Sequence, residues 1–301
     1  MPERLFCGID GGGSKTRIAL CDDQGHRLGL TVAGPTSLTL RGPGAWDVIV
    51  EALRGLCATV GREAGDFSEV HFGIGLAGVN NTAQRTLFIE AAPAVAALHV
   101  ATDAYIAALG AHQGAPGAIV IVGTGSVGYR IEASGASRLV GGWGFPIGDE
   151  GSGAWLGRAA LAQTLHVVED RSPVRASEMH RALIERCGPS RDALMGWVRG
   201  ASSTEYAALA PLVIECAGRD DPAALPLATA AGVEIDALAL ALDPGRSIPL
   251  SLVGGLAQPL APYMPAPLRD WIQEPHDEPI AGALMLAQGW APDESLAWRG
   301  E

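Results

Sequence analysis

A pattern of strand, glycine cluster and strand occurs twice in this chain, and it constrains the possible fold more than any other feature. In the first copy, the apolar run 5–9 is followed by Asp10, the glycine-rich stretch 11–15 and an apolar run ending at residue 20. In the second copy, the apolar run 118–122 is followed by the glycine-rich stretch 123–126 and the run 127–131. Each copy predicts a β-hairpin, and the repeat predicts two domains of related architecture.

The first hairpin has the chemistry of an anion site. Glycine has no Cβ, so the turn can be tight and its N–H groups can approach a ligand closely. Asp10 lies at the mouth of this turn, and N–H donors beside one carboxylate suit a nucleotide phosphate with Mg²⁺. A purely structural glycine turn is the alternative. The GxxxxGK[ST] spacing of a Walker A loop is absent, and a strand follows where a dinucleotide-binding turn would open a helix.

The second hairpin contains a literal GxGxxG match at residues 123–128. We reject the dinucleotide-binding interpretation, because residues 129–131 continue as a strand. A second phosphate-binding hairpin explains the pattern better, and the two hairpins would hold the β- and γ-phosphates from either side. A structural turn remains the alternative here too.

Length and composition support two globular domains. The chain has 301 residues, of which 48% are hydrophobic, enough for a sizeable core in each domain. The stretch Gly114-Ala115-Pro116-Gly117 is the most linker-like segment. We therefore expect an N-terminal domain over residues 1–114 and a C-terminal domain over residues 115–301.

The net charge and the cysteines limit which partners and which cellular compartment are compatible with this sequence. A net charge of −12 argues against nucleic acid and anionic membranes, which call for a basic surface. We see no leader sequence and no apolar run of about 18 residues, so we expect neither a signal peptide nor a membrane span. The five cysteines form no CxxC pair, which fits reduced thiols in the core of a cytoplasmic protein. The seven histidines lack ligand spacing, so we expect no zinc site.

The remaining elements follow from apolar periodicity and from glycine and proline punctuation. We expect further strands at residues 27–32, 70–76, 98–101 and 248–253. Helices are expected at residues 43–60, 82–92, 104–111, 152–166, 176–187, 191–199, 204–216, 222–242 and 279–288, and a further one opening at Gly254-Gly255-Leu256.

Two acidic positions are candidates for chemistry. Asp103 follows a short strand and precedes a helix, where it could be an ordinary N-cap or the general base that takes a proton from an acceptor hydroxyl. Asp149 and Glu150 also precede a helix, so capping and helix-dipole compensation explain them too. The run before them is unusually rich in glycine, and exposed backbone beside carboxylates suits the recognition of sugar hydroxyls. Trp143 lies in this run. It could be a core residue, or its ring could be a platform on which a sugar stacks.

Other positions have less specific signals. Lys15 could reach a phosphate oxygen or could be a solvated turn lysine. Gly254 and Gly255 join a strand to a helix, which suits a contact with adenosine or phosphate or a tight structural joint. Thr36 and Ser37 form a turn with two hydroxyls.

Six motifs in order resemble the BadF/BadG/BcrA/BcrD ATPase family, and in particular its N-acetylglucosamine/glucosamine kinase branch. They are Asp10 with its glycines, Thr102-Asp103-Ala104, the stretch 123–126, Gly141-Gly142-Trp143, the stretch 148–152 and Gly254-Gly255. The resemblance extends from about residue 5 to residue 290.

The resemblance implies an α/β fold of two ribonuclease-H-like, actin-like ATPase domains with an interdomain cleft. It implies that the last helix, at about residues 279–289, packs back on the N-terminal domain. For the nucleotide it implies that Asp10 holds Mg²⁺ through water and that the phosphate and adenosine contacts come from Gly12, Gly13, Ser14, Lys15, Thr16, Gly123, Thr124, Gly125, Ser126, Gly254 and Gly255. For the sugar it implies contacts from Thr36, Ser37, Asp103, Gly142, Trp143 and Asp149, with Asp103 as the base.

The expected function is therefore the ATP-dependent phosphorylation of the 6-hydroxyl of glucosamine or N-acetylglucosamine. One departure bears on the substrate, because these kinases often carry an asparagine where this chain has Thr36-Ser37. We expect a cytoplasmic homodimer that uses ATP and Mg²⁺. An ATPase activator of an iron–sulfur dehydratase or reductase is one alternative, and a non-catalytic sugar-sensing regulator is another.

Overall fold

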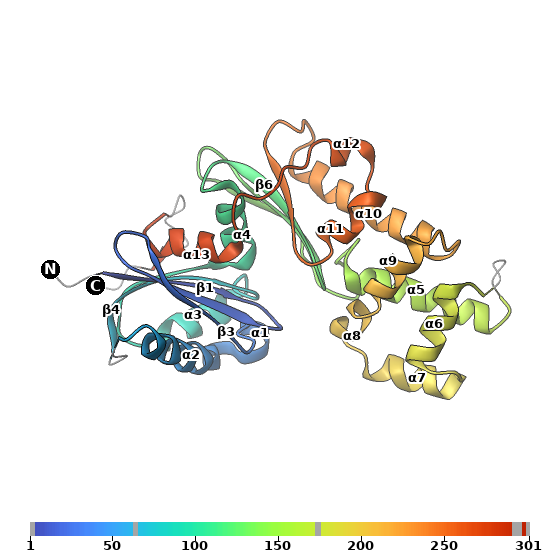
Figure 1. Cartoon of the computed structure of the whole chain (residues 1–301), viewed down its shortest axis with the longest axis horizontal. Coiled ribbons are helices and arrows are strands. Elements are labelled where there is room, and N and C mark those ends of the chain that lie inside the picture. The colour runs from blue at the N-terminus through green and yellow to red at the C-terminus, as the bar shows by residue number, and fades with distance from the viewer. Residues whose placement is uncertain (1–3, 63–65, 172–175, 291–296, 299–301) are drawn as a thin grey trace. The chain divides into compact units, whose positions relative to one another are not determined.

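The computed structural model describes residues 4–62, 66–171, 176–290 and 297–298 (Figure 1). Its contacts divide the chain into two compact units. Unit 1 comprises Met1–Gly117, Ile131–Ser137 and Glu274–Glu301, and unit 2 comprises Ala118–Arg130 and Arg138–Gln273. The C-terminal segment therefore belongs to the unit that the N-terminus begins.

The sheet of unit 1 has the strand order β10-β5-β4-β1-β2-β3. β1 pairs antiparallel with β2, which pairs antiparallel with β3, and on its other side β1 runs parallel to β4. Alternate residues of β1, such as Cys7 and Ile9, point into the core, as the period of two in a strand requires. The strands are β1 Leu5–Gly11, β2 Thr16–Cys21, β3 Arg27–Ala33, β4 Phe67–Leu76, β5 Val95–Thr102 and β10 Ala297–Trp298.

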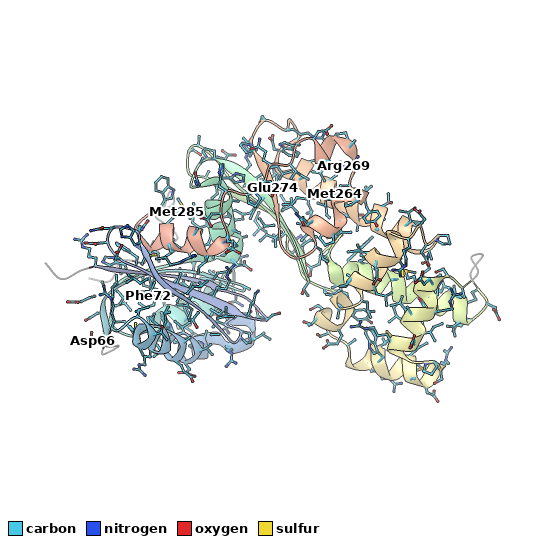
Figure 2. All side chains as sticks on the ribbon, viewed as in Figure 1. Asp66, Phe72, Met264, Arg269, Glu274 and Met285 are labelled. Atoms are coloured by element: carbon cyan, nitrogen blue, oxygen red, sulfur yellow. The ribbon has the colours of Figure 1, made fainter. Side chains whose placement is uncertain are left out.

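Helices cover both faces of this sheet (Figure 1). One face carries α1 Leu38–Arg41, α2 Ala45–Thr59 and α3 Thr82–Glu90, with the 3₁₀ turn η1 Gly42–Gly44 before α2. Aromatic rings fill this layer: Trp46 stacks on Phe88 at 4.7 Å and meets Phe72 edge-on at 6.0 Å. Phe72 is labelled in Figure 2. The other face carries α4 Asp103–His112 and α13 Pro279–Ala287.

The sheet of unit 2 has the order β8-β7-β6-β9. Its strands are β6 Gly117–Val122, β7 Ser126–Ile131, β8 Ser137–Gly141 and β9 Leu250–Val253. This order repeats β3-β2-β1-β4 of unit 1, and β6 runs parallel to β9 as β1 does to β4. The repeat read from the sequence is thus a repeat of topology, and the predicted mixed α/β class is confirmed.

Unit 2 is otherwise helical: α5 Gly153–Val168, α6 Glu178–Cys187, α7 Arg191–Gly200, α8 Ser203–Ala207, α9 Ala210–Ala217, α10 Ala224–Leu242, α11 Ala257–Leu260, η2 Ala261–Tyr263 and α12 Ala266–Arg269. The single helix expected at residues 204–216 was wrong, because α8 ends before α9 begins. Pro211 lacks an N–H and is tolerated only in the first turn of a helix, where it lies in α9.

The cysteines and one face of the most apolar long helix lie in the interior of the protein. All five cysteines are free and buried, as predicted. Among the described helices, α10 alone has the length and hydropathy of a membrane-spanning segment. Its residues Ala228, Ile235 and Leu242 belong to the hydrophobic core of unit 2, which is the position of a core helix.

Candidate active site

The predicted site residues fall in both units. In unit 1, the first glycine hairpin (residues 11–16) joins β1 to β2. The N–H of Gly12 donates to the carbonyl of Lys15 at 3.0 Å and closes the turn. The N–H groups of Gly13, Ser14 and Lys15 have no hydrogen-bond partner among the described residues. The turn therefore presents free donors, as an anion cradle requires.

The hairpin is anchored to the turn at residues 34–37. Thr16 and Thr36 are fully buried, and their hydroxyl oxygens lie 2.8 Å apart. The N–H groups of Thr36 and Ser37 donate to the carbonyl of Gly12 at 3.2 and 3.1 Å. The two predicted sugar-binding hydroxyls thus differ, because Thr36 is engaged with Thr16. Ser37 is also buried, but its hydroxyl makes no capping hydrogen bond to α1.

Two carboxylates of unit 1 carry raised pKa values. Asp10 is the last residue but one of β1, where burial raises its pKa to about 6 and the nearby charge of Asp103 adds to the effect. Arg17 and Lys15 oppose this shift. Burial also raises the pKa of Asp103. Perturbed pKa values of neighbouring acids are typical of functional sites.

Asp103 is not the N-cap of its helix. Thr102 is the N-cap of α4, and its hydroxyl accepts a hydrogen bond from the N–H of Tyr105 at 3.0 Å. Asp103 Oδ1 accepts a hydrogen bond from the N–H of Ala104 at 2.9 Å, and the N–H of Asp103 itself also donates to this carboxylate. The donors recorded for this carboxylate are backbone groups at the start of α4, so they hold it in place, as a positioned general base requires.

An ion pair that we did not predict lies beside Asp10. Arg17 faces Asp10 across the β1–β2 ladder and forms a bidentate ion pair with Glu278, at 2.9 and 2.5 Å. Glu278 is the N-cap residue of α13, far along the chain. The cross-strand position of Arg17 beside Asp10 follows from the hairpin, but its partner is decided only by tertiary structure.

In unit 2, the second glycine hairpin (residues 123–126) joins β6 to β7. The carbonyls of Gly123 and Thr124 accept hydrogen bonds from the N–H groups of Gly153 and Ala154, at 2.9 and 3.1 Å. The first two N–H groups of α5 therefore hold this hairpin in place. The N–H groups of Thr124 and Gly125 form no hydrogen bond to a described residue, which leaves donors for an anion.

Asp149 ties two loops of unit 2 together. It is buried, and its Oδ1 accepts a hydrogen bond from the N–H of Ser126 at 3.3 Å. Burial raises its pKa, and backbone donors at Ser126, Phe145 and Gly144 oppose the shift. Ser126 Oγ in turn donates to the carbonyl of Glu150 at 2.7 Å. The helix cap belongs to Ser152, so capping does not explain Asp149.

The loop before α5 exposes two large apolar side chains. Trp143 is 86% exposed and Ile147 is 90% exposed, so Trp143 is not a core residue. Gly142 and Gly144 have positive φ and shape the loop around Trp143. An exposed tryptophan suits stacking against a sugar ring.

Gly254 has a backbone reason to be glycine. Its φ is +101°, and an added Cβ would collide with the backbone of Val122 in β6. The N–H of Leu256 donates to the carbonyl of Val122 at 3.0 Å. Gly255 faces open space. The joint is tight at Gly254 and open at Gly255, where a ligand could approach.

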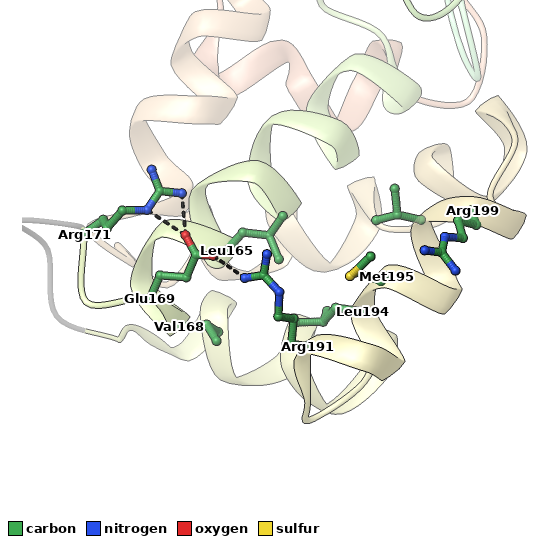
Figure 3. A pocket seen from close by; sticks show the side chains of 9 residues that line it. Leu165, Val168, Glu169, Arg171, Arg191, Leu194, Met195 and Arg199 are labelled. Carbon is green, nitrogen blue, oxygen red and sulfur yellow. Dashed lines mark hydrogen bonds and ion pairs between the residues drawn. The ribbon is translucent and has the colours of Figure 1, made fainter.

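A cavity of about 560 Å³ lies elsewhere in unit 2, between α5 and α7 (Figure 3). Leu165, Leu194 and Met195 contribute apolar surface. Glu169 pairs with both Arg171 and Arg191, so internal ion pairs account for most of the charge at its rim. None of the predicted site residues lines this cavity.

The model of the BadF/BadG/BcrA/BcrD ATPase family matches residues 7–287. A glucosamine kinase of Vibrio cholerae is 31% identical over 282 residues, covering 94% of this chain and 95% of that protein. An N-acetyl-D-glucosamine kinase of Dictyostelium discoideum is 28% identical over 276 residues, covering 85% and 86%. A crystal structure from Chromobacterium violaceum, provisionally named an N-acetylglucosamine kinase, has a TM-score of 0.90 at 38% identity and covers 95% and 99%.

Proposed function

Because the chain belongs to the BadF/BadG/BcrA/BcrD ATPase family, we propose that it is an ATP-dependent kinase of glucosamine or N-acetylglucosamine. The observation that carries this proposal is the similarity to a glucosamine kinase across 94% of the chain. The structure from Chromobacterium violaceum, similar over 95% of the chain, supports the same class. We assign the phosphoryl acceptor as the 6-hydroxyl.

In unit 1, the free N–H groups of the first glycine hairpin bind phosphate oxygens, and Lys15 adds a positive charge. This assignment covers Gly12, Gly13, Ser14 and Thr16, of which Thr16 contributes through its backbone position. Asp10 suits Mg²⁺, which is bound through one or two carboxylates, substrate phosphates and waters. When bound, the ion neutralises charge on the transferred group.

Asp103 is the general base. Backbone N–H groups hold its carboxylate, and its raised pKa makes the carboxylate a better proton acceptor than an ordinary aspartate. It orients the sugar hydroxyl and accepts its proton as the oxygen attacks the γ-phosphorus. Phosphoryl transfer depends mainly on positioning and charge stabilisation, which one base and two donor-rich hairpins supply.

In unit 2, the second glycine hairpin supplies Gly123, Thr124, Gly125 and Ser126 to the phosphates, and Gly254 and Gly255 lie at the adenosine. Trp143 and the backbone of Gly142 contact the sugar ring, together with Asp149. In unit 1, Ser37 contributes its hydroxyl to the sugar and Thr36 contributes through its position.

We expect a homodimer, which size-exclusion chromatography with light scattering tests.

The iron–sulfur activator is the weaker candidate. Such a protein needs cysteines that bridge a cluster at a dimer interface. All five cysteines of this chain are buried free thiols, in the interiors of the two units. The buried positions of these side chains favour the kinase.

The test is a coupled ADP-release assay over a panel of hexoses and hexosamines, with the product's phosphorylation site read by NMR. We expect amino sugars to be the best acceptors. The Asp103→Asn variant should fold, bind ATP and lose turnover by roughly 10²–10⁴-fold. The matched control is Asp192→Asn, an acid in the first turn of α7, which should keep wild-type turnover. Near-wild-type kcat in Asp103→Asn would refute the assignment of the base.

A further inference from the structure

Two buried threonine hydroxyls connect the phosphate and sugar segments of unit 1. Thr16 ends the first glycine hairpin, and Thr36 lies in the turn that precedes α1. Both side chains have no exposed surface. Thr16 Oγ1 donates to the carbonyl of Gly34 at 2.7 Å and lies 2.8 Å from Thr36 Oγ1.

The direction of this relay follows from proton counting. A hydroxyl has one proton to donate and two lone pairs to accept. Because Thr16 donates to Gly34, the proton between the two threonines must come from Thr36. Neither hydroxyl proton is therefore left for a ligand.

The backbone reinforces the same connection. The carbonyl of Gly12 accepts hydrogen bonds from the N–H groups of Thr36 and Ser37. Gly11 lies so close to the turn that an added Cβ would collide with Thr36 Oγ1 and with Leu76. Four hydrogen bonds consequently hold the hairpin to the turn, and the two segments are closely packed at Gly11.

We propose that Thr16 and Thr36 are positioning residues whose hydroxyl relay holds the phosphate-binding N–H groups and the sugar-facing Ser37 in register. This inference rests on the proposed kinase function. Ser37 is the turn's hydroxyl that reaches the sugar, while Thr36 acts through Thr16. The binding of either substrate then depends on the same buried hydrogen bonds, so the loss of one hydroxyl weakens the binding of both ATP and the amino sugar.

The test compares Michaelis constants across four variants. Thr36→Ala should raise KM for ATP and KM for the amino sugar together, each by about five- to tenfold, the effect of one lost buried hydrogen bond. Ser37→Ala should raise KM for the sugar alone, and Ser14→Ala should raise KM for ATP alone. Thr36→Ser keeps the hydroxyl and should restore values near wild type.

A double-mutant cycle tests the relay itself. Thr16→Val and Thr36→Ala remove the same hydrogen bond, so the double variant should cost no more than the worse single variant. Thr164→Val is the matched control, since its buried hydroxyl bonds only to Ala160 within α5, and its KM values should not change. Thermal melts of each variant establish that it is folded.

The outcomes separate the two proposals. Absence of sugar-dependent ADP release in the wild-type protein would refute the kinase function. With wild-type activity established, the relay would be refuted by additive effects of Thr16→Val and Thr36→Ala, by an effect of Thr36→Ala on one substrate alone, or by a Thr36→Ser variant as impaired as Thr36→Ala.

Discussion

The carboxylate of Asp10 is placed where its charge costs stability. Burial and the neighbouring charge of Asp103 raise its pKa to about 6, although Arg17 faces it across the ladder. A group that is costly in the free protein and favourable beside a bound cation is typical of a functional site. Removal of this charge should therefore have opposite effects on stability and on activity.

We expect Asp10→Asn to stabilise the protein in the absence of nucleotide and magnesium. The native pKa exceeds the unfolded value, so ionisation penalises the folded state above about pH 6 and costs nothing below about pH 4. With a discount for partial solvent screening, the gain at pH 7.5 is about 1–3 kcal/mol. Urea unfolding at pH 7.5 and pH 4 measures it, and the gain should vanish at the lower pH.

Asp66 provides the opposite case. Hydrogen bonds from Ser68 lower the pKa of this exposed carboxylate, so Asp66→Asn removes favourable interactions and should not stabilise the protein (Figure 2). A loss of stability in Asp10→Asn at pH 7.5, or an equal gain in both variants, would contradict the desolvation argument.

At the scale of elements, glycines set how closely α13 lies on the sheet of unit 1. Gly73 in β4 faces this helix, and an added Cβ would collide with the backbone of Ala283 and Ala287. Gly8 in β1 has the same relation to the helix, where an added Cβ would lie 2.8 Å from Leu284 Cγ. The helix therefore rests on backbone, and its position depends on the missing side chains.

Gly73→Ala should destabilise the protein by about 1–3 kcal/mol, because backbone atoms cannot move aside as a side chain can. Gly55 is the matched control, an exposed glycine inside α2 with open space around it. Gly55→Ala should stabilise by about 0.5–1 kcal/mol, since alanine loses less backbone entropy on folding. Chemical unfolding followed by circular dichroism measures both, and a neutral Gly73→Ala would contradict the close packing.

At the scale of the whole molecule, the chain closes on its first domain. Residues 274–290 contribute α13 to unit 1, and Glu278 at its start pairs with Arg17 in β2. Residues 118–130 and 138–273 form the other unit in between. Unit 1 therefore depends on residues that follow unit 2 in the sequence.

A chain that ends at Gln273 should lose cooperative unfolding of unit 1, because the face of β1 and β4 would be uncovered. Limited proteolysis and hydrogen exchange should show the loss in residues 5–112. A chain that ends at Trp290 keeps α13 and lacks only the short edge strand β10, so it should lose protection at β5 alone. Equal protection of residues 5–112 in both truncations would show that α13 is dispensable.

The relation of sequence to structure differs among these features. The two hairpins, the strands and most helices could be predicted, because glycine turns and apolar periodicity are local signals. The split between α8 and α9 depended on Pro211, which we read as part of one longer helix. The exposure of Trp143 could not be predicted, because an aromatic side chain in a glycine-rich loop is compatible with either surface or core.

The sequence alone determined the repeated architecture, the glycine hairpins and the family, because each depends on residue types in a fixed order. Only the tertiary structure decided which groups share hydrogen bonds: Thr16 with Thr36, Arg17 with Glu278, and Asp149 with the N–H of Ser126. Side chains separated by 20 to 261 positions carry no local signal of their pairing. Their partners are fixed by the order of strands in each sheet and by where the last helix packs.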